Sequence, residues 1–506
     1  MLFNSSEFIF VFLPFAVLLH FALARWSVTA AVIATTLTSL LFYAWWNPPF
    51  ILLPVLSITV NFLIAHAMRA GGESNARRLL IIGIVANLAV LGFFKYGDFL
   101  VSIFEGRKPN PPEVPLALSF TTFVQIAFLV DVWRRRGAVD LPIYAMFVAF
   151  FPHLIAGPIV RWEELGPQLR DRARYRLDWN NIALGLTIFT LGLAKKVLIA
   201  DKLAPHVGPV FDAAARGDPL TAFAAWGAAF GFSAQIYFDF SGYSDMAVGL
   251  GLLFNLRLPV NFAAPFRSTN VIDLWRRWHA SLARFMRDFV FMPLGGRARN
   301  PIKRLAYLVA TLTIGGLWHG ANWTYIAWGA LNGVAIAINH AWRMRRGKKR
   351  ETSIPGRFAG WFVTFLVFVV TVVFFRAADI GAAAHMVKAM AGFGNAPYAD
   401  VMHVGWDQWG IRVGYISESL VRSWLGGYWS VVGTLLTAGA LAIAFFIPDT
   451  MELVDYREGE PYHEWRRNVG VLAWQPSVKW FLVLMLLFIA SFANILQFTE
   501  FLYYQF

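Results

Sequence analysis

Apolar runs separated by short polar stretches make up most of this chain of 506 residues. A helix of about 20 apolar residues can cross the roughly 30 Å hydrocarbon core of a bilayer, and most of the runs approach that length. Because one run is much shorter, we expect some of the helices to be re-entrant. The pattern therefore predicts an all-α fold, a polytopic membrane helix bundle of about 11–13 spanning or re-entrant helices. The runs lie at about 8–24, 28–46, 50–68, 79–96, 116–133, 141–160, 181–200, 221–238, 243–256, 304–318, 323–341, 358–375, 428–447 and 478–498.

The composition agrees with a membrane protein and limits its chemistry. Hydrophobic residues make up 58% of the chain and aromatic residues 16%, and the mean hydropathy is +0.54. A soluble enzyme of this size is far less apolar. The chain has no cysteine, which excludes thiol catalysis, disulfides and cysteine-ligated metal centres. Any chemistry therefore uses oxygen or nitrogen groups.

The net charge of +14 would suggest nucleic-acid binding in a soluble protein, but here the basic residues fall between apolar runs. Such short basic segments are typical of cytoplasmic loops. We therefore expect a multi-pass protein surrounded by membrane lipids, with no nucleic-acid partner. Lys195-Lys196 is one predicted cytoplasmic loop, and the strongest is Arg343–Arg350. The segment Met1–Arg25 has no basic residue before its apolar run, so we expect a retained first span and not a secretory signal.

We expect one membrane domain over residues 1–506, with N-terminal helices at 1–140, a catalytic core at 141–342 and C-terminal helices and loops at 343–506. In the middle part, Gly, Pro, His and charged residues enter otherwise apolar sequence. Irregular backbone at membrane depth is tolerated only where protein or a water-filled cavity covers it. The functional site is therefore predicted in this part.

His319 stands in the uncharged run Thr311–Ala330, which is long enough to cross a bilayer as a helix. An ionisable side chain at membrane depth indicates function by default. Gly315, Gly316 and Gly320 leave room for another helix or a ligand to approach. The alternative is that His319 only hydrogen-bonds a neighbouring helix.

Two further stretches place polar groups in apolar surroundings. Two prolines and a glycine in 151–161 predict a loop that enters the bundle, where His153 either contacts a substrate or has a structural role. The stretch 237–251 contains Asp239 and Asp245, which need partners when buried. They could form a proton or ion path, or a buried network with hydroxyls or arginines. Both acids and Tyr243 are candidate substrate-binding residues.

The stretch Asp273–Leu282 has the apolar spacing of an amphipathic, interfacial helix. It contains Arg276 and Arg277 and, forty positions before His319, His279. Neither histidine has the H-E-x-x-H spacing of zinc proteases, so we expect no metal.

Two motifs in this region, Trp275–Leu282 (WRRWHASL) and Gly315–Ala321 (GGLWHGA), resemble the signature of the membrane-bound O-acyltransferases. Within that superfamily, further stretches resemble the bacterial alginate O-acetyltransferase branch. These are Phe3-Asn-Ser5, Phe42–Trp46, His153–Arg161, Tyr237–Gly251, Phe374–Arg376 and Phe501–Phe506.

The resemblance implies a helix bundle enclosing a tunnel through the inner membrane of a bacterial cell. Along it an acetyl group passes from a cytoplasmic donor toward an exported polysaccharide or a periplasmic acetyltransferase partner. Acetyl-CoA is the implied donor and acts as a substrate, so no tightly bound cofactor is expected. By position, His319 is the catalytic histidine of the family and His279 its second active-site residue. Residues 100–115 and 395–475 are expected to determine partner or polymer specificity.

The chemistry of these residues fits acyl transfer. Histidine, with an unperturbed pKa of about 6.5, suits the removal of a proton from an attacking hydroxyl, so His319 is the predicted base. The oxyanion that forms needs donors, for which Trp318, Asn322, backbone near Gly320 or a protonated His279 are candidates. Arginines could hold the phosphates of the donor or only anchor the protein at the membrane surface. These are Arg276, Arg277, Arg284 and Arg287.

The first hypothesis is therefore an O-acetyltransferase that modifies an exported polysaccharide, most simply alginate, with cellulose, peptidoglycan or another polymer as alternatives. A second is a proton- or ion-coupled transporter based on Asp239, Asp245 and His319, although the internal repeats typical of transporters are not apparent. A third is the membrane scaffold of a secretion complex.

Overall fold

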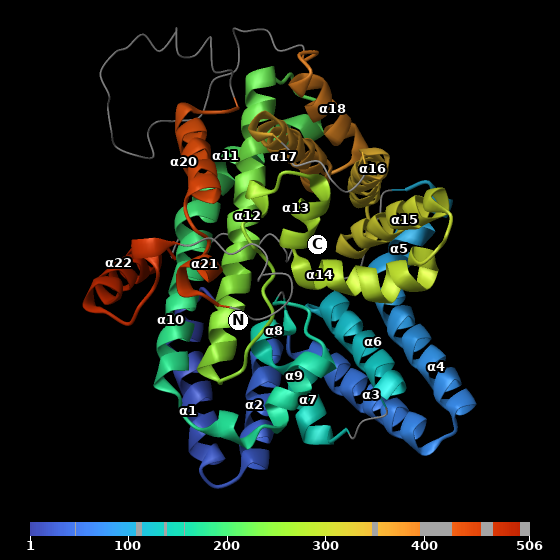
Figure 1. Ribbon diagram of the computed structural model, residues 1–506, viewed down its shortest axis with the longest axis vertical. Helices are drawn as coiled ribbons and strands as arrows, with labels where there is room; N and C mark the ends of the chain where they lie inside the picture. The colour runs from blue at the N-terminus through green and yellow to red at the C-terminus, as the bar shows by residue number, and fades with distance from the viewer. Residues whose placement is uncertain are drawn as a thin grey trace.

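A computed structural model of the chain describes residues 1–45, 47–107, 114–135, 139–155, 157–346, 353–394, 428–456 and 469–495. Over these residues the protein consists of helices and connecting segments without a strand, which confirms the predicted all-α bundle. Figure 1 shows the helices gathered around α12 (Ala222–Leu253), which runs through the middle of the molecule.

The helices before residue 175 are α1 (Leu13–Ala24), α2 (Val28–Ala44), α3 (Leu52–Ala70), α4 (Glu73–Leu91), α5 (Gly97–Glu105), α6 (Leu118–Arg135), α7 (Leu141–Ala149), α8 (Phe151–Leu154) and α9 (Trp162–Arg170). The middle of the chain forms α10 (Trp179–Ala194), α11 (Asp201–Arg216), α12, α13 (Val271–Arg277), α14 (Ala280–Phe285), α15 (Pro301–His319) and α16 (Trp323–Arg346). The remaining described helices are α17 (Ile354–Arg376), α18 (Ile380–Met390), α20 (Val431–Phe446), α21 (Thr450–Val454) and α22 (Val478–Asn494).

Several helical segments have the length and hydropathy of membrane spans. Among the described residues, four are long and apolar enough to cross a bilayer: Pro48–Ala70, Glu73–Glu105, Trp179–Arg216 and Ile354–Arg376. Shorter apolar helices of 10–17 residues accompany them, such as Val28–Ala44 and Val478–Asn494. The protein is thus polytopic, and the number of 11–13 crossings stays a prediction.

The outer surface of α3 and α4 is apolar, whereas their contact is polar. Leu56, Leu63 and Ile82 are all more than half exposed, which suits contact with lipid and not with water. Between the helices, the Asn87 amide donates to Asn61 Oδ1 at 2.7 Å, and both side chains are buried. These two polar side chains are therefore turned inward and satisfied between the helices.

Helices α15 and α16 form a tight hairpin at the right of Figure 1. The run Thr311–Ala330 is not one crossing, because α15 ends at His319 and α16 begins at Trp323. The bilayer-crossing helix predicted over Thr311–Ala330 is therefore wrong, whereas the separate apolar runs at 304–318 and 323–341 agree with the break. The hairpin depends on glycine: a Cβ on Gly316 would lie 2.1 Å from the Tyr325 carbonyl oxygen, and one on Gly329 would lie 2.3 Å from that of Leu312.

Helices α10 and α12 pack by the same principle. Two glycine pairs lie at their interface, Gly185 with Gly249 and Gly192 with Gly242, and a Cβ on any of these four would come within 2.7 Å of the opposite glycine's carbonyl oxygen. The two pairs are seven residues apart on each helix. The residue number rises from 185 to 192 along α10 while that of the partner falls from 249 to 242 along α12, so the helices are antiparallel. Backbone contact of this kind replaces the hydrophobic effect, which gives no drive to helix association in lipid.

We expect Gly316→Ala to destabilise the protein by about 1–3 kcal/mol, because the new methyl group overlaps a backbone carbonyl that cannot move cheaply. Thermal unfolding of the purified protein in detergent measures this. The matched control is Gly439→Ala in α20, where a Cβ would meet nothing within 4 Å. Equal unfolding temperatures for the two variants would show that the close approach in the hairpin is wrong.

Candidate active site

His319 is the last residue of α15 and lies inside a cluster of aromatic rings. Its side chain is buried, and the residue is 5% exposed. The imidazole meets the rings of Trp328 and Phe375 edge to face, with centroids 5.2 and 5.1 Å away. The aromatic rings come from α15, α16 and α17, so three helices fix the position of one imidazole.

His279 lies at a break between two short helices. The single amphipathic helix predicted over 273–282 is wrong, because α13 ends at Arg277 and α14 begins at Ala280. Between them His279 has φ 46° and ψ 51°, the left-handed conformation that disfavours residues with a Cβ. At the break, the Ala280 amide donates to the Asn261 carbonyl at 3.0 Å and not to a carbonyl of the preceding helical turn.

A buried hydrogen-bond network holds this break in place. Asn261 Oδ1 accepts from the Ser281 hydroxyl at 2.6 Å, and Asn261 Nδ2 donates to the Ser244 hydroxyl at 3.2 Å. The Ile159 amide donates to Ser281 Oγ at 2.9 Å. Sequence reasoning assigned no role to Asn261 or Ser281. The available signal was an asparagine within the apolar stretch 258–263.

Trp318 connects the two histidines. Its ring centroid lies 4.9 Å from that of His319 and 6.3 Å from that of His279. The indole is 4% exposed, and its Nε1 has no hydrogen-bond acceptor among the described residues. A buried N–H group without an acceptor costs free energy. A substrate oxygen that accepts a hydrogen bond from it would explain its presence. The fold therefore brings together three predicted site residues: Trp318, His319 and, forty positions before His319, His279.

The buried acids of α12 are paired with lysines. Asp245 lies 2.6 Å from Lys195, and Asp239 lies 2.6 Å from Lys196, which also contacts Asp201 at 2.6 Å. The cytoplasmic loop predicted at Lys195-Lys196 is wrong, because both residues belong to the continuous helical segment Trp179–Arg216 and Lys196 is 2% exposed. The acids form the buried network considered above, with lysine partners where arginines had been expected.

The candidate phosphate-binding arginines differ in their surroundings. Arg276 is exposed at the surface of α13, and Arg277 Nε contacts Asp273 at 3.0 Å on the same helix. Arg284 contacts Glu164 at 2.5 Å, and Arg287 contacts Asp288 at 2.7 Å. Of these, Arg276 has the surroundings best suited to an external anion. A phosphate-binding role for any of them stays a prediction.

Asn322 follows His319 by three residues, whereas Tyr243 belongs to α12, and each contacts another part of the protein. The Asn322 amide donates to the Ala378 carbonyl at 2.9 Å, and its Oδ1 accepts from the Thr324 amide at 3.1 Å, where α16 begins. Tyr243 stacks on Phe3, with ring centroids 4.7 Å apart. Their predicted contacts with substrate or donor remain predictions.

His153 lies in the broken segment that the prolines predicted. Helix α7 ends at Ala149, and the four-residue helix α8 follows it. His153 is 3% exposed, and its Nε2 lies 2.9 Å from the Phe147 carbonyl oxygen. This agrees with the structural role considered for it.

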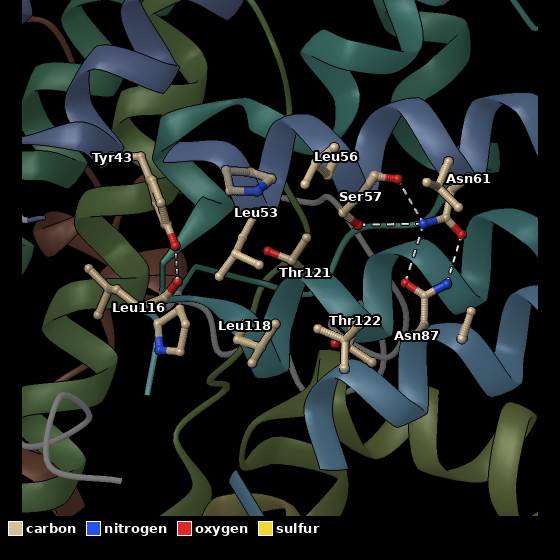
Figure 2. Close-up of a pocket in the computed structure, with 15 residues that line it drawn as sticks. Tyr43, Leu53, Leu56, Ser57, Asn61, Asn87, Leu116, Leu118, Thr121 and Thr122 are labelled. Carbon is tan, nitrogen blue, oxygen red and sulfur yellow. Dashed lines mark hydrogen bonds between the residues drawn. The ribbon is translucent and has the colours of Figure 1, made fainter. Parts of the chain in front are cut away.

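A pocket of about 140 Å³ lies on the side of α6 that faces away from Trp318 (Figure 2). Thr121 and Thr122 of α6 line it together with residues of α3 and α4, whereas Phe120 and Phe123 contact the ring of Trp318. The pocket is therefore separated from the histidines by α6. The tunnel implied by the family resemblance stays a prediction.

Comparison with known proteins adds to this geometry. A sequence profile of the membrane-bound O-acyltransferase family matches residues 128–375, a range that contains both histidines. The chain is 36% identical to a probable alginate O-acetylase of Pseudomonas aeruginosa, over 100% of each protein. It is 40% identical to a probable alginate O-acetylase of Azotobacter vinelandii, over 79% of this chain and 80% of that one. It is 39% identical to a peptidoglycan O-acetyltransferase of Helicobacter pylori, over 78% of this chain and 80% of that one.

The left-handed backbone at His279 predicts an order of stability between two variants. His279→Gly and His279→Ala both lack the imidazole, but only glycine adopts this conformation without strain, so His279→Gly is expected to be more stable by about 1 kcal/mol. Thermal unfolding in detergent measures the difference. As a control, Ala280→Gly in the adjacent helix is expected to lower stability. A less stable His279→Gly than His279→Ala would contradict the backbone assignment.

Proposed function

Because the chain belongs to the membrane-bound O-acyltransferase family, we propose that it passes an acetyl group from a cytoplasmic donor across the membrane for the O-acetylation of an exported polysaccharide, with alginate as the first candidate. The protein is a multi-pass membrane O-acyltransferase. Acetyl as the acyl group and a polysaccharide as its destination are supported by the relatives, which are named for the O-acetylation of alginate or peptidoglycan.

The observation that carries the proposal is the meeting of His319 and His279 at the Trp318 indole. In the proposed step, the acceptor hydroxyl oxygen bonds to the acetyl carbonyl carbon while His319 takes the hydroxyl proton. The carbonyl oxygen becomes an oxyanion, for which the buried Trp318 N–H is a suitable donor. The bond to the leaving thiolate then breaks, and the thiolate takes the proton from His319.

The donor in this proposal is acetyl-CoA, which serves as a substrate and not as a bound cofactor. Its thiolate leaving group completes the step above, and its phosphates are anions that an exposed cation such as Arg276 suits. The donor is cytoplasmic and the polymer is exported, so we place the protein in the bacterial inner membrane. A periplasmic acetyltransferase that receives the acetyl group and passes it to the polymer is the proposed partner.

Alginate is favoured among the acceptors because the probable alginate O-acetylase of P. aeruginosa aligns over its whole length. Peptidoglycan is the second candidate, supported by a relative of nearly equal identity over four fifths of its length. The regions expected to decide between polymers include 395–427 and 457–468, which lie outside the described residues. The transporter hypothesis gains no support, since Asp239 and Asp245 are each engaged by a lysine.

We expect His319→Ala to lower acetyl release from labelled acetyl-CoA by at least about 100-fold, because it removes the base. The assay uses purified protein with alginate, peptidoglycan fragments or cellulose added one at a time. The control is His206→Ala, a half-buried histidine hydrogen-bonded to Ser430 in another part of the bundle. Undiminished turnover by folded His319→Ala protein would refute the assignment of the base.

A further inference from the structure

Lys95 is a buried cation that the proposed reaction does not use. It lies in the long apolar segment Glu73–Glu105, one of the candidate membrane spans, and is 6% exposed. The helix widens into a π turn over Gly92–Tyr96 at this point. Such turns change which residues face inward and are frequent at functional sites. A lysine at membrane depth is costly and indicates a function.

The Lys95 ammonium has three donors, and the structure provides three acceptors. Nζ lies 2.6 Å from the Trp318 carbonyl oxygen and 3.0 Å from that of His319. It also lies 3.2 Å from the Ser119 hydroxyl of α6. Its donor capacity is therefore filled, as a buried charge requires.

The two carbonyls belong to the last turn of α15, where no residue further along the helix can donate to them. Many helices solve this problem with a left-handed glycine just beyond the end, but Gly320 has an extended backbone, with φ −169°. The neighbouring Tyr96 hydroxyl donates to the carbonyl of Leu317 at 2.9 Å. Lys95 and Tyr96 thus bind three consecutive carbonyls, and the positive charge lies at the negative end of the helix dipole.

The same contacts place the charge beside the candidate catalytic groups. Lys95 Nζ lies 5.9 Å from the centroid of the Trp318 ring, which touches both imidazoles. The residues whose carbonyls it binds are the ones that carry the predicted oxyanion donor and the predicted base. A displacement of this backbone would move both groups at once.

We propose that Lys95 and Tyr96 are positioning residues for the acyl transfer, which hold the backbone of Leu317, Trp318 and His319 so that the indole and the imidazole face the reacting groups. This inference rests on the proposed function, because it takes His319 as the base. Both residues lie outside the range that the family profile matches and come from the N-terminal helices. The pair therefore joins a distant part of the chain to the reaction centre.

The experiment compares single substitutions in the full-length protein with acetyl-CoA as donor and measures kcat and KM separately. Lys95→Met keeps the unbranched stem and removes the ammonium. We expect kcat to fall about 100-fold, the scale of a small misplacement of catalytic groups, while KM for acetyl-CoA changes less than about threefold. Lys95→Arg keeps a charged donor, and its kcat is expected to be at least about tenfold higher than that of Lys95→Met.

A pair of tyrosine variants provides a matched control. Tyr96→Phe and Tyr43→Phe each remove a hydroxyl that donates to a backbone carbonyl at 2.9 Å, but the Tyr43 hydroxyl binds Leu116, and both of these residues line the pocket of Figure 2. Tyr96→Phe is expected to lower kcat about three- to tenfold, and Tyr43→Phe to leave it unchanged. This pair decides the matter even if the Lys95→Met protein does not fold.

Wild-type kcat in folded Lys95→Met protein, or equal kcat in the two tyrosine variants, would overturn the proposal. A fall in activity that only follows the amount of folded protein, without recovery in Lys95→Arg, would reduce Lys95 to a helix cap and also overturn it. Parallel measurement of His319→Ala separates this result from the proposed function. Full activity in His319→Ala would refute the assignment of His319 as the base. If His319→Ala is inactive but the Lys95 and Tyr96 variants have normal kcat, only the positioning role is refuted.

Discussion

The end of α15 imposes the constraint on which the site depends. A helix that stops inside a membrane protein leaves its last carbonyl groups without water to satisfy them. Here the last residue of the helix is also the predicted base, so the groups that satisfy the backbone fix the catalytic side chain as well. The glycine contact between α15 and α16 brings the next helix close enough to cover the same end.

The distribution of helices followed from the sequence because lipid imposes a simple rule, a long apolar run for each span. The break between 304–318 and 323–341 could be located in this way. The rule failed at Lys195-Lys196, where two lysines in an apolar run resembled a loop. Each lysine has a partner on α12 more than forty positions away, Asp245 for Lys195 and Asp239 for Lys196, and nothing in the local pattern reveals those pairings.

The candidate site was predictable in its residue types and not in its geometry. The two histidine motifs identified His279 and His319, but the left-handed backbone of His279 depends on hydrogen bonds to Asn261, which no local propensity predicts. The link through Trp318 required the fold. Lys95 was overlooked because it is a single basic residue near the end of an apolar run, and its two carbonyl partners are more than 220 positions away.

That separation has a consequence for how the protein is made. The segment with Lys95 enters the membrane long before α15 has been synthesised, and during that interval the ammonium lacks both carbonyl acceptors. A lysine costs at most about 2.5–3.5 kcal/mol in an inserting helix, the value for the helix centre, and the contacts that offset this cost for Lys95 form only when α15 arrives. The contact between Lys95 and α15 therefore completes the satisfaction of a buried charge and the candidate reaction centre together.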